Sequence, residues 1–230
     1  MTSLYAFADI APSATYMKNG SEVTVTASPG EEGVEITEEA PLHVSFKANE
    51  SFLDEGASLE WHFNHKGAGG SSSEITRYEA DTEFDFVESG LTIVTLNVMQ
   101  EGEVISSAEF RITISESHLE MPNAFSPNND GHNDKYGAKG VNSDDPNSTG
   151  HYKSIVDFHA YIFNRWGQKL YEWHDVSGSW DGTFHGSPVK DGVYFVVVKA
   201  RGADGIEYDI RRDVNLIRKF NEVSNTGGQE

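Results

Sequence analysis

An oxygen-rich turn near the middle of the chain has the residue types of a cation site. Asn128, Asp130 and Asp134 supply side-chain oxygens around Gly131, and oxygens at alternate positions around a glycine turn can surround a hard cation such as calcium. An EF-hand is excluded because no glutamate stands twelfth, counted from Ser126. The same residue types form Asx-turns, in which a side chain bonds nearby backbone amides. The sequence therefore predicts either a calcium site or an Asx-turn, and no other cofactor.

Two histidines three residues apart, His62 and His65, are the next candidates for metal ligands. They fall in a strand-like segment, where residues i and i+3 point to opposite faces, and no third ligand is near them in the sequence. Their spacing therefore does not predict a metal site. The chain has no cysteine, which excludes disulfides, iron–sulfur clusters and thiolate zinc sites.

The chain lacks the motifs of common catalytic sites. It contains no Gly-x-Ser-x-Gly, no His-Glu-x-x-His and no phosphate-binding glycine loop. Catalysis needs a nucleophile with a positioned base, so we predict that this chain is not an enzyme. Four aromatic residues, Trp166, Tyr171, Trp173 and Tyr194, could form a platform for a glycan, or they could be core residues and cross-strand pairs of a β-sandwich.

The charge of the chain argues against nucleic acid as a partner. The formal net charge is -20 at pH 7, whereas binding to phosphates or to an anionic membrane face needs Lys and Arg. The charge is also uneven: residues 1–117 hold 5 Lys and Arg against 21 Asp and Glu, and residues 118–230 hold 12 against 16. This difference predicts a domain boundary near residue 118.

The hydrophobic pattern predicts strands almost throughout. Apolar residues alternate with polar ones in 42–48 and 110–115, as in half-buried antiparallel strands. No segment repeats apolar residues at helical spacing for three turns. The longest apolar run, 193–198, is far short of the roughly 20 residues that span a bilayer, so no membrane span is expected. Short strands separated by turns rich in Asn, Asp and Gly predict an all-β chain made of sandwiches.

Several motifs follow one another in the second half of the chain. The first is the segment Met121-Pro-Asn-Ala-Phe-Ser-Pro-Asn-Asn-Asp-Gly-His-Asn-Asp134, followed by Phe163-Asn-Arg-Trp-Gly167, Trp180-Asp-Gly182 and Gly192-Val-Tyr194. In this order they resemble the gliding-motility-associated C-terminal domain of Bacteroidetes surface proteins, a type B sorting domain of type IX secretion. The matching residues, expected to be mostly structural, are Pro122, Asn123, Phe125, Pro127, Asp130, Gly131, Asn164, Arg165, Trp166, Gly167, Trp180, Asp181, Gly182, Gly192 and Tyr194.

The first half has a second, weaker resemblance. The segments Leu59-Glu-Trp-His-Phe63, 78–86, 90–98 and 110–114 resemble the polycystic-kidney-disease (PKD) repeat, an Ig-like sandwich. The resemblance covers about residues 36–116. Residues 1–35 are expected either to add strands to this domain or to be the remnant of a preceding one.

Together these patterns predict two Ig-like β-sandwich domains in tandem: 1–117, PKD-like, and 118–220, the gliding-motility-associated domain, with a disordered tail at 221–230. The resemblance implies the C-terminal part of a larger exported protein, located outside the cell or on its surface. It would act in sorting and surface attachment, with the type IX machinery or outer-membrane components as partners. The alternative is an adhesive or carbohydrate-binding accessory module of a larger secreted protein.

Overall fold

The computed structural model describes residues 10–51, 53–140 and 152–218, and every regular element in them is a β-strand. The all-β prediction is therefore confirmed. The described residues form two compact units. The first contains the described residues up to 117 together with Lys153–Val156 and Gly202–Ile206, and the second contains the other described residues from 118 onward. No described residue lies in a helix that is long and apolar enough to cross a membrane.

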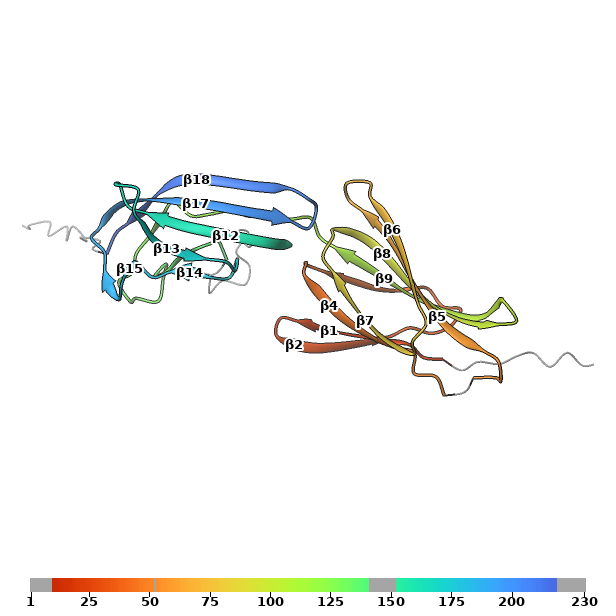
Figure 1. The fold of residues 1–230 in the computed structure, drawn as a ribbon. Coiled ribbons are helices and arrows are strands. Elements are labelled where there is room, and N and C mark those ends of the chain that lie inside the picture. The colour runs from red at the N-terminus through yellow and green to blue at the C-terminus, as the bar shows by residue number, and fades with distance from the viewer. Residues whose placement is uncertain (1–9, 52, 141–151, 219–230) are drawn as a thin grey trace, which may run out of the picture. The chain divides into compact units, whose positions relative to one another are not determined.

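Two sheets form the first unit, and they face each other as the layers of a sandwich (Figure 1). One sheet has the order β2-β1-β4-β7 and the other β3-β9-β8-β5-β6. The strands of the first sheet are β1 (Ser13–Lys18), β2 (Ser21–Thr26), β4 (Leu42–Lys47) and β7 (Asp81–Phe86). Those of the second are β3 (Val34–Glu38), β5 (Ser58–Gly67), β6 (Ser72–Arg77), β8 (Gly90–Gln100) and β9 (Glu103–Ile114).

The first unit has the pairings of an Ig-like sandwich. β3 runs parallel to β9, with Val34 opposite Phe110, whereas the other pairs in this sheet are antiparallel. β1 pairs with β4, and β2 pairs with β1, so the described residues that precede β3 add two strands to this unit. The PKD-like character of the unit stays a prediction.

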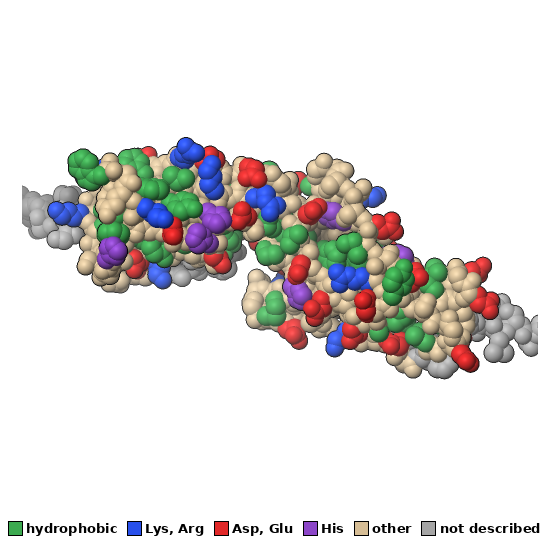
Figure 2. Space-filling view, in the orientation of Figure 1, with side chains coloured by type: hydrophobic (Ala, Val, Ile, Leu, Met, Phe, Trp, Pro, Cys, Tyr) green, Lys and Arg blue, Asp and Glu red, His purple; other side chains and the backbone are tan. Residues whose placement is uncertain are grey.

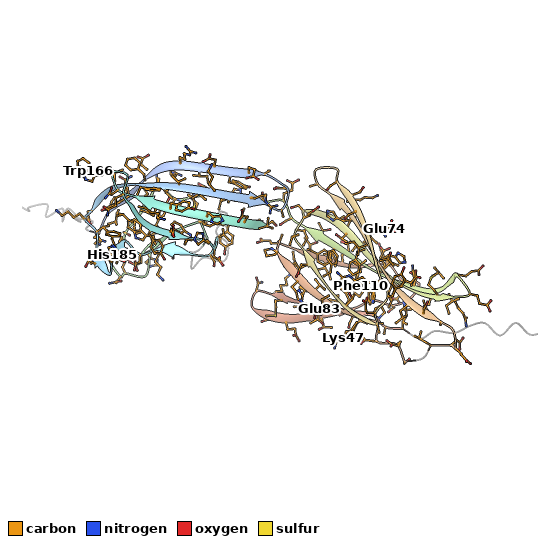
Figure 3. All side chains as sticks on the ribbon, viewed as in Figure 1. Lys47, Glu74, Glu83, Phe110, Trp166 and His185 are labelled. Carbon is orange, nitrogen blue, oxygen red and sulfur yellow. The ribbon has the colours of Figure 1, made fainter. Side chains whose placement is uncertain are left out.

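Alternation along each strand places one face in the core. Leu42, Val44 and Phe46 of β4 are buried, while His43 and Lys47 between and beside them are exposed. The Phe46 ring lies 5.5 Å from that of Trp61, 5.6 Å from Phe63 and 5.8 Å from Phe110, in tilted or edge-on geometry. Figure 3 shows Phe110 between the two layers. Such aromatic contacts join the two sheets across the core.

The second unit has one full sheet, in the order β10-β18-β17-β12-β13, and two short ladders, β11-β14 and β15-β16. The strands of the sheet are β10 (Ala124–Phe125), β12 (Ile155–Phe163), β13 (Lys169–Trp173), β17 (Gly192–Gly202) and β18 (Glu207–Leu216). The ladders contain β11 (Tyr136–Gly137), β14 (Ser179–Trp180), β15 (Thr183–Phe184) and β16 (Ser187–Pro188).

Trp180 joins the ladders to the sheet. It is fully buried, and its ring lies 5.4 Å from Phe125 of β10 and 5.4 Å from Tyr194 of β17. Tyr136 of β11 is also fully buried, and its ring lies 5.7 Å from Phe125. Four aromatic rings thus pack between the ladder β11-β14 and the sheet.

The division between the units is not a single cut near residue 118. Ala203 is buried in the core cluster of the first unit, and its carbonyl accepts a 2.9 Å hydrogen bond from the Ser89 amide. Ser154 accepts a 3.1 Å bond from the Ala40 amide through its hydroxyl. Two short segments from the second half of the chain therefore complete the first unit. The tail predicted at 221–230 lies outside the described residues.

Candidate functional site

The Asn- and Asp-rich turn between β10 and β11 is organised by one carboxylate. Asp134 Oδ1 accepts hydrogen bonds from the amides of Asn128 (2.9 Å) and Asn129 (2.6 Å), and Oδ2 accepts one from Gly131 (2.9 Å). Positive φ angles at Asn129 (62°) and Gly131 (88°) let these amides converge on it. All three contacts of this carboxylate are to backbone amides of the turn. The bond from the Asp130 amide to Asn128 Oδ1 (3.1 Å) has the spacing of an Asx-turn.

Asp130 is held by a second set of bonds within the same turn. Its Oδ2 accepts a 2.8 Å bond from the Asn128 side-chain amide, and Oδ1 accepts one of 2.8 Å from the His132 backbone amide. These two bonds, in that order, hold the pKa of Asp130 below its usual range. Among the described residues no group of three or more His, Asp or Glu is arranged as a metal site. Calcium at Asn128, Asp130 and Asp134 stays a prediction.

The Trp180-Asp181-Gly182 motif is a tight turn that closes on its own groups. The indole N–H of Trp180 donates a 2.8 Å hydrogen bond to the Thr183 carbonyl. Asp181 Oδ1 accepts bonds from the Thr183 amide (2.9 Å) and hydroxyl (2.8 Å). Gly182 has a φ of 78°, a conformation that favours glycine. The motif therefore buries the indole ring and supplies its N–H with an acceptor.

Arg218 connects this turn to the Asp191-Gly-Val-Tyr194 motif. Its guanidinium donates to the carbonyls of Val189 (2.5 Å) and Gly182 (3.0 Å) and to Asp191 Oδ1 (2.9 Å). Its backbone amide donates to Asp191 Oδ2 at 2.9 Å. A guanidinium can satisfy several acceptors at fixed angles. Arg218 thus holds three segments together just beyond the end of β18.

The Asn164-Arg-Trp-Gly167 motif forms the turn between β12 and β13. Asn164 Oδ1 accepts bonds from the amides of Trp166 (2.9 Å) and Gln168 (3.1 Å), while its Nδ2 donates to Gln168 Oε1 (3.0 Å). Gly167 has a φ of 77°. The turn is therefore ordered by its own side chains, yet Trp166 is 84% exposed. Figure 3 shows Trp166 at one end of the unit, directed away from the strands.

A shallow pocket lies beside this turn. Its volume is about 290 Å³, and its lining includes Trp166, Leu170, Phe184 and Tyr194. Arg165 and Lys190 also line it and are exposed. The pocket therefore combines an exposed indole, apolar side chains, two cationic side chains and the carboxylate of Asp191.

Not all of the aromatic residues considered as a glycan platform are exposed. Trp173 is 6% exposed and Tyr194 8% exposed, so both are core residues, whereas Tyr171 is 39% exposed. The suggestion of a four-residue platform is therefore wrong. Tyr194 faces inward because β17 alternates, and its hydroxyl donates a 2.6 Å bond to the Lys190 carbonyl.

The remaining motif residues bond or pack inside the second unit. Phe125 is 3% exposed, the Pro122 carbonyl accepts a 3.0 Å bond from the Tyr136 hydroxyl, and the Asn123 carbonyl accepts one of 2.9 Å from the Asn215 amide. Gly192 begins β17 with a φ of 149°. Pro127 lies beside Gly182, since a Cβ on that glycine would stand 3.1 Å from Pro127 Cγ.

The two histidines of β5 bind different partners. His62 contacts the Thr76 hydroxyl (3.3 Å) and Glu60 (3.2 Å), while His65 Nδ1 lies 2.9 Å from the Thr92 hydroxyl. The structure does not bring the two rings together. This agrees with the strand alternation, which places them on opposite faces.

The family comparison assigns the second half of the chain. Residues 119–209 match the family model of the CHU_C type IX secretion signal domain. Residues 119–209 are a type IX secretion signal domain. Such a domain is a sorting signal on a secreted protein, and it marks proteins that are exported to the cell surface or secreted. The recognition of this family from its ordered motifs is confirmed.

Other comparisons add no argument about function. No curated protein sequence matches the chain. One similar solved structure is a tetra-tandem repeat in the extending region of a large adhesion protein, with 12% identity, a TM-score of 0.29, and coverage of 94% of this chain and 69% of that one. Another is dimeric latent PorU from Porphyromonas gingivalis, with 9% identity, a TM-score of 0.25, and coverage of 90% and 20%.

Sequence reasoning missed two residues that organise the signal domain. Arg218 stands two residues after the end of β18. The one sequence signal for its role is a positive charge at the end of a strand pattern. Tyr136 stands two residues after Asp134, and a lone aromatic residue beside a polar turn is a signal of a buried anchor. Neither belongs to the motifs that suggested the family.

We expect Gly182→Ala to destabilise the signal domain more than Gly186→Ala. Both glycines have positive φ, 78° and 75°, so both substitutions carry a backbone cost of about 1–2 kcal/mol. Only at Gly182 would the new Cβ meet neighbours, Pro127, Arg218 and Leu216, at 3.1–3.2 Å, which adds about 1–3 kcal/mol. Urea unfolding of both variants measures the difference. Equal losses would contradict the packing around Gly182.

We expect Tyr136→Phe to change the alkaline stability of the protein. Burial raises the pKa of Tyr136, against an opposing effect of Arg212. The pKa of a tyrosine in the unfolded chain is about 10. The stability that the raised pKa of Tyr136 contributes is therefore fully present below pH 10, and it is lost as the pH rises towards the pKa in the folded protein. Tyr136→Phe should cost about 1–2 kcal/mol at pH 7, because the Pro122 carbonyl loses its donor. It should also lose stability less steeply above pH 10, as urea unfolding at several pH values can measure. A slope identical to that of the unchanged protein would contradict this.

The predicted calcium site can be tested by thermal unfolding. If Asn128, Asp130 and Asp134 bind calcium, the ion should stabilise the protein by about 2.7 kcal/mol at one hundred times its dissociation constant. The melting temperature should therefore rise between chelator and millimolar calcium, and Asp134→Asn should abolish the rise. An unchanged melting temperature would reject the calcium site, and the Asx-turn would be the only interpretation left.

Proposed function

We propose that the signal domain directs this chain through the type IX secretion machinery and then attaches it to the cell surface, and that the chain has no catalytic activity. The observation that carries this proposal is the match over residues 119–209. The supporting geometry is that three of its motifs meet at one end of the domain, where Arg218 bonds to Gly182 and Asp191 and the pocket includes Asn164 and Tyr194.

We further propose that Trp166 is a contact residue for the secretion machinery or for an outer-membrane component. The other aromatic motif residues, Phe125, Trp180 and Tyr194, are buried, whereas Trp166 is 84% exposed on a turn that its neighbours hold in place. Folding therefore does not account for a tryptophan at this position. Exposed Trp residues on rigid supports are typical of binding hot spots, because they bury a large area with little loss of entropy.

The second candidate function is that of an adhesive or carbohydrate-binding module. It is favoured by a pocket of about 170 Å³ in the first unit, lined by Ile75, Phe84 and Val87 together with Asp85 and Glu88. Aromatic and apolar walls beside carboxylates suit a sugar ring and its hydroxyls. Under this proposal Phe84→Ala should abolish binding on a glycan array, and Trp166→Ala should not affect it.

Export can be tested with a periplasmic reporter fused ahead of the whole chain in a host that has the type IX machinery. The reporter should reach the cell surface, and removal of residues 118–230 should retain it in the periplasm because the signal domain is lost. Trp166→Ala should lower the surface fraction several-fold. Tyr78→Ala is the matched control, since it removes an aromatic side chain that is 68% exposed in the first unit.

Each part of the proposal has its own contrary result. Retention of the unchanged fusion in the periplasm would reject sorting by this chain. Normal export of Trp166→Ala would reject the contact role of Trp166 and leave the sorting function standing. Release of the reporter into the medium, instead of recovery with washed cells, would reject surface attachment.

A further inference from the structure

Two histidine rings meet on the outer face of the sheet in the signal domain. His159 lies on β12 and His174 directly follows β13; because Ala160 pairs with Trp173, the two histidines stand opposite each other. Their Nδ1 atoms are 2.7 Å apart, and the ring centroids are separated by 4.7 Å at an interplanar angle of 72°. Both residues are exposed or partly exposed. Figure 2 shows histidine side chains together over β12 and β13, beside acidic and basic side chains.

Asp157 lies beside one of these rings. It lies two residues before His159 on the same face of β12, and its Oδ1 is 3.4 Å from His159 Nε2. A proton on Nε2 directed at this carboxylate leaves the lone pair on Nδ1, which faces His174. A carboxylate that holds the far nitrogen of a histidine is the usual support of a metal-binding imidazole.

We propose that His159 and His174 chelate a divalent transition-metal ion such as zinc through their two Nδ1 atoms. Neutral imidazole is a preferred ligand of zinc, nickel and copper. Zinc–nitrogen bonds of about 2.0–2.1 Å in tetrahedral geometry place the two nitrogens roughly 3.3 Å apart. The rings therefore need to separate by about half an ångström, which small side-chain rotations on an exposed face allow.

The site has two protein ligands, and water completes the coordination of the ion. This agrees with the finding that no group of three or more His, Asp or Glu forms a metal site in the described residues. Of the nearby acidic residues, Glu172 is bonded to Lys169, and Asp157 faces the far side of the His159 ring. The ion would connect β12 to β13, the edge strand of the sheet. The site shares no residue with the Asn- and Asp-rich turn or with the Trp166 pocket.

Other described histidines lack this arrangement and provide controls. His43 has Asp85 at 2.7 Å on Nδ1 and Glu83 at 3.8 Å on Nε2, so its two nitrogens face separate carboxylates instead of a second imidazole. Its exposure is similar, because 56% of its side chain is accessible against 44% for His159. His43→Ala therefore removes an exposed histidine without removing the chelate.

The experiment is a calorimetric titration of the whole chain with zinc chloride. We expect His159→Ala and His174→Ala each to remove the same one equivalent of bound zinc, and the double variant to remove no more. His43→Ala should bind as the unchanged protein does. Asp157→Asn should weaken binding at this site about tenfold, as loss of a supporting carboxylate does. Circular dichroism of each variant checks that the fold is retained.

Two results would overturn the proposal. One is the absence of any zinc equivalent that depends on both His159 and His174. The other is a nitrogen-15 spectrum in which zinc shifts the Nε2 resonances of these two rings and leaves Nδ1 unchanged. Shifts at both Nδ1 atoms are the expected result.

Discussion

Hydrogen bonds from backbone amides to Asp and Asn side chains are the interaction on which the signal domain depends. One layer of this domain has only two-residue ladders, so many of its amides have no strand partner. Asp134 accepts three such bonds, Asn164 two and Asp181 one. In each of these turns a side chain thus supplies the acceptor that a backbone carbonyl supplies within a strand pair.

This requirement explains why the recognisable motifs are turns and not strands. Asn and Asp tolerate positive φ and bond to amides nearby in the sequence, here two to six residues away. Glycine reaches conformations closed to other residues. A β-strand can exchange Val for Ile at little cost, whereas Asp134 or Gly182 has no such substitute. The ordered motifs therefore reflect the geometry of the turns, and each is placed by a strand that begins or ends beside it.

Much of the fold could be predicted from the sequence, because alternation is a local property. The strands around Leu42–Lys47 and Phe110–Ile114 follow directly from it. The errors concern long-range contacts. Trp173 and Tyr194 seemed available for a ligand, but the parity of β13 and β17 turns both inward. The bonds of Arg218 to residues 27 to 36 positions earlier, and the meeting of His159 with His174, depend on pairing that no local pattern encodes.

In the candidate site, the residues that stabilise the fold are different from the residue that is exposed for recognition. Substitution of a buried motif residue such as Trp180 would disturb the fold, so loss of export in that variant could not be assigned to a lost contact. Trp166 differs because its turn is held by backbone amides and by Asn164, and not by the indole. The pocket beside it is lined by Arg165 and Lys190, and by Asp191, whose carboxylate is paired with Arg218. Salt at physiological strength screens charges beyond about 8 Å. A partner at this end of the domain therefore meets local positive charge, even though the chain as a whole has a net charge of -20.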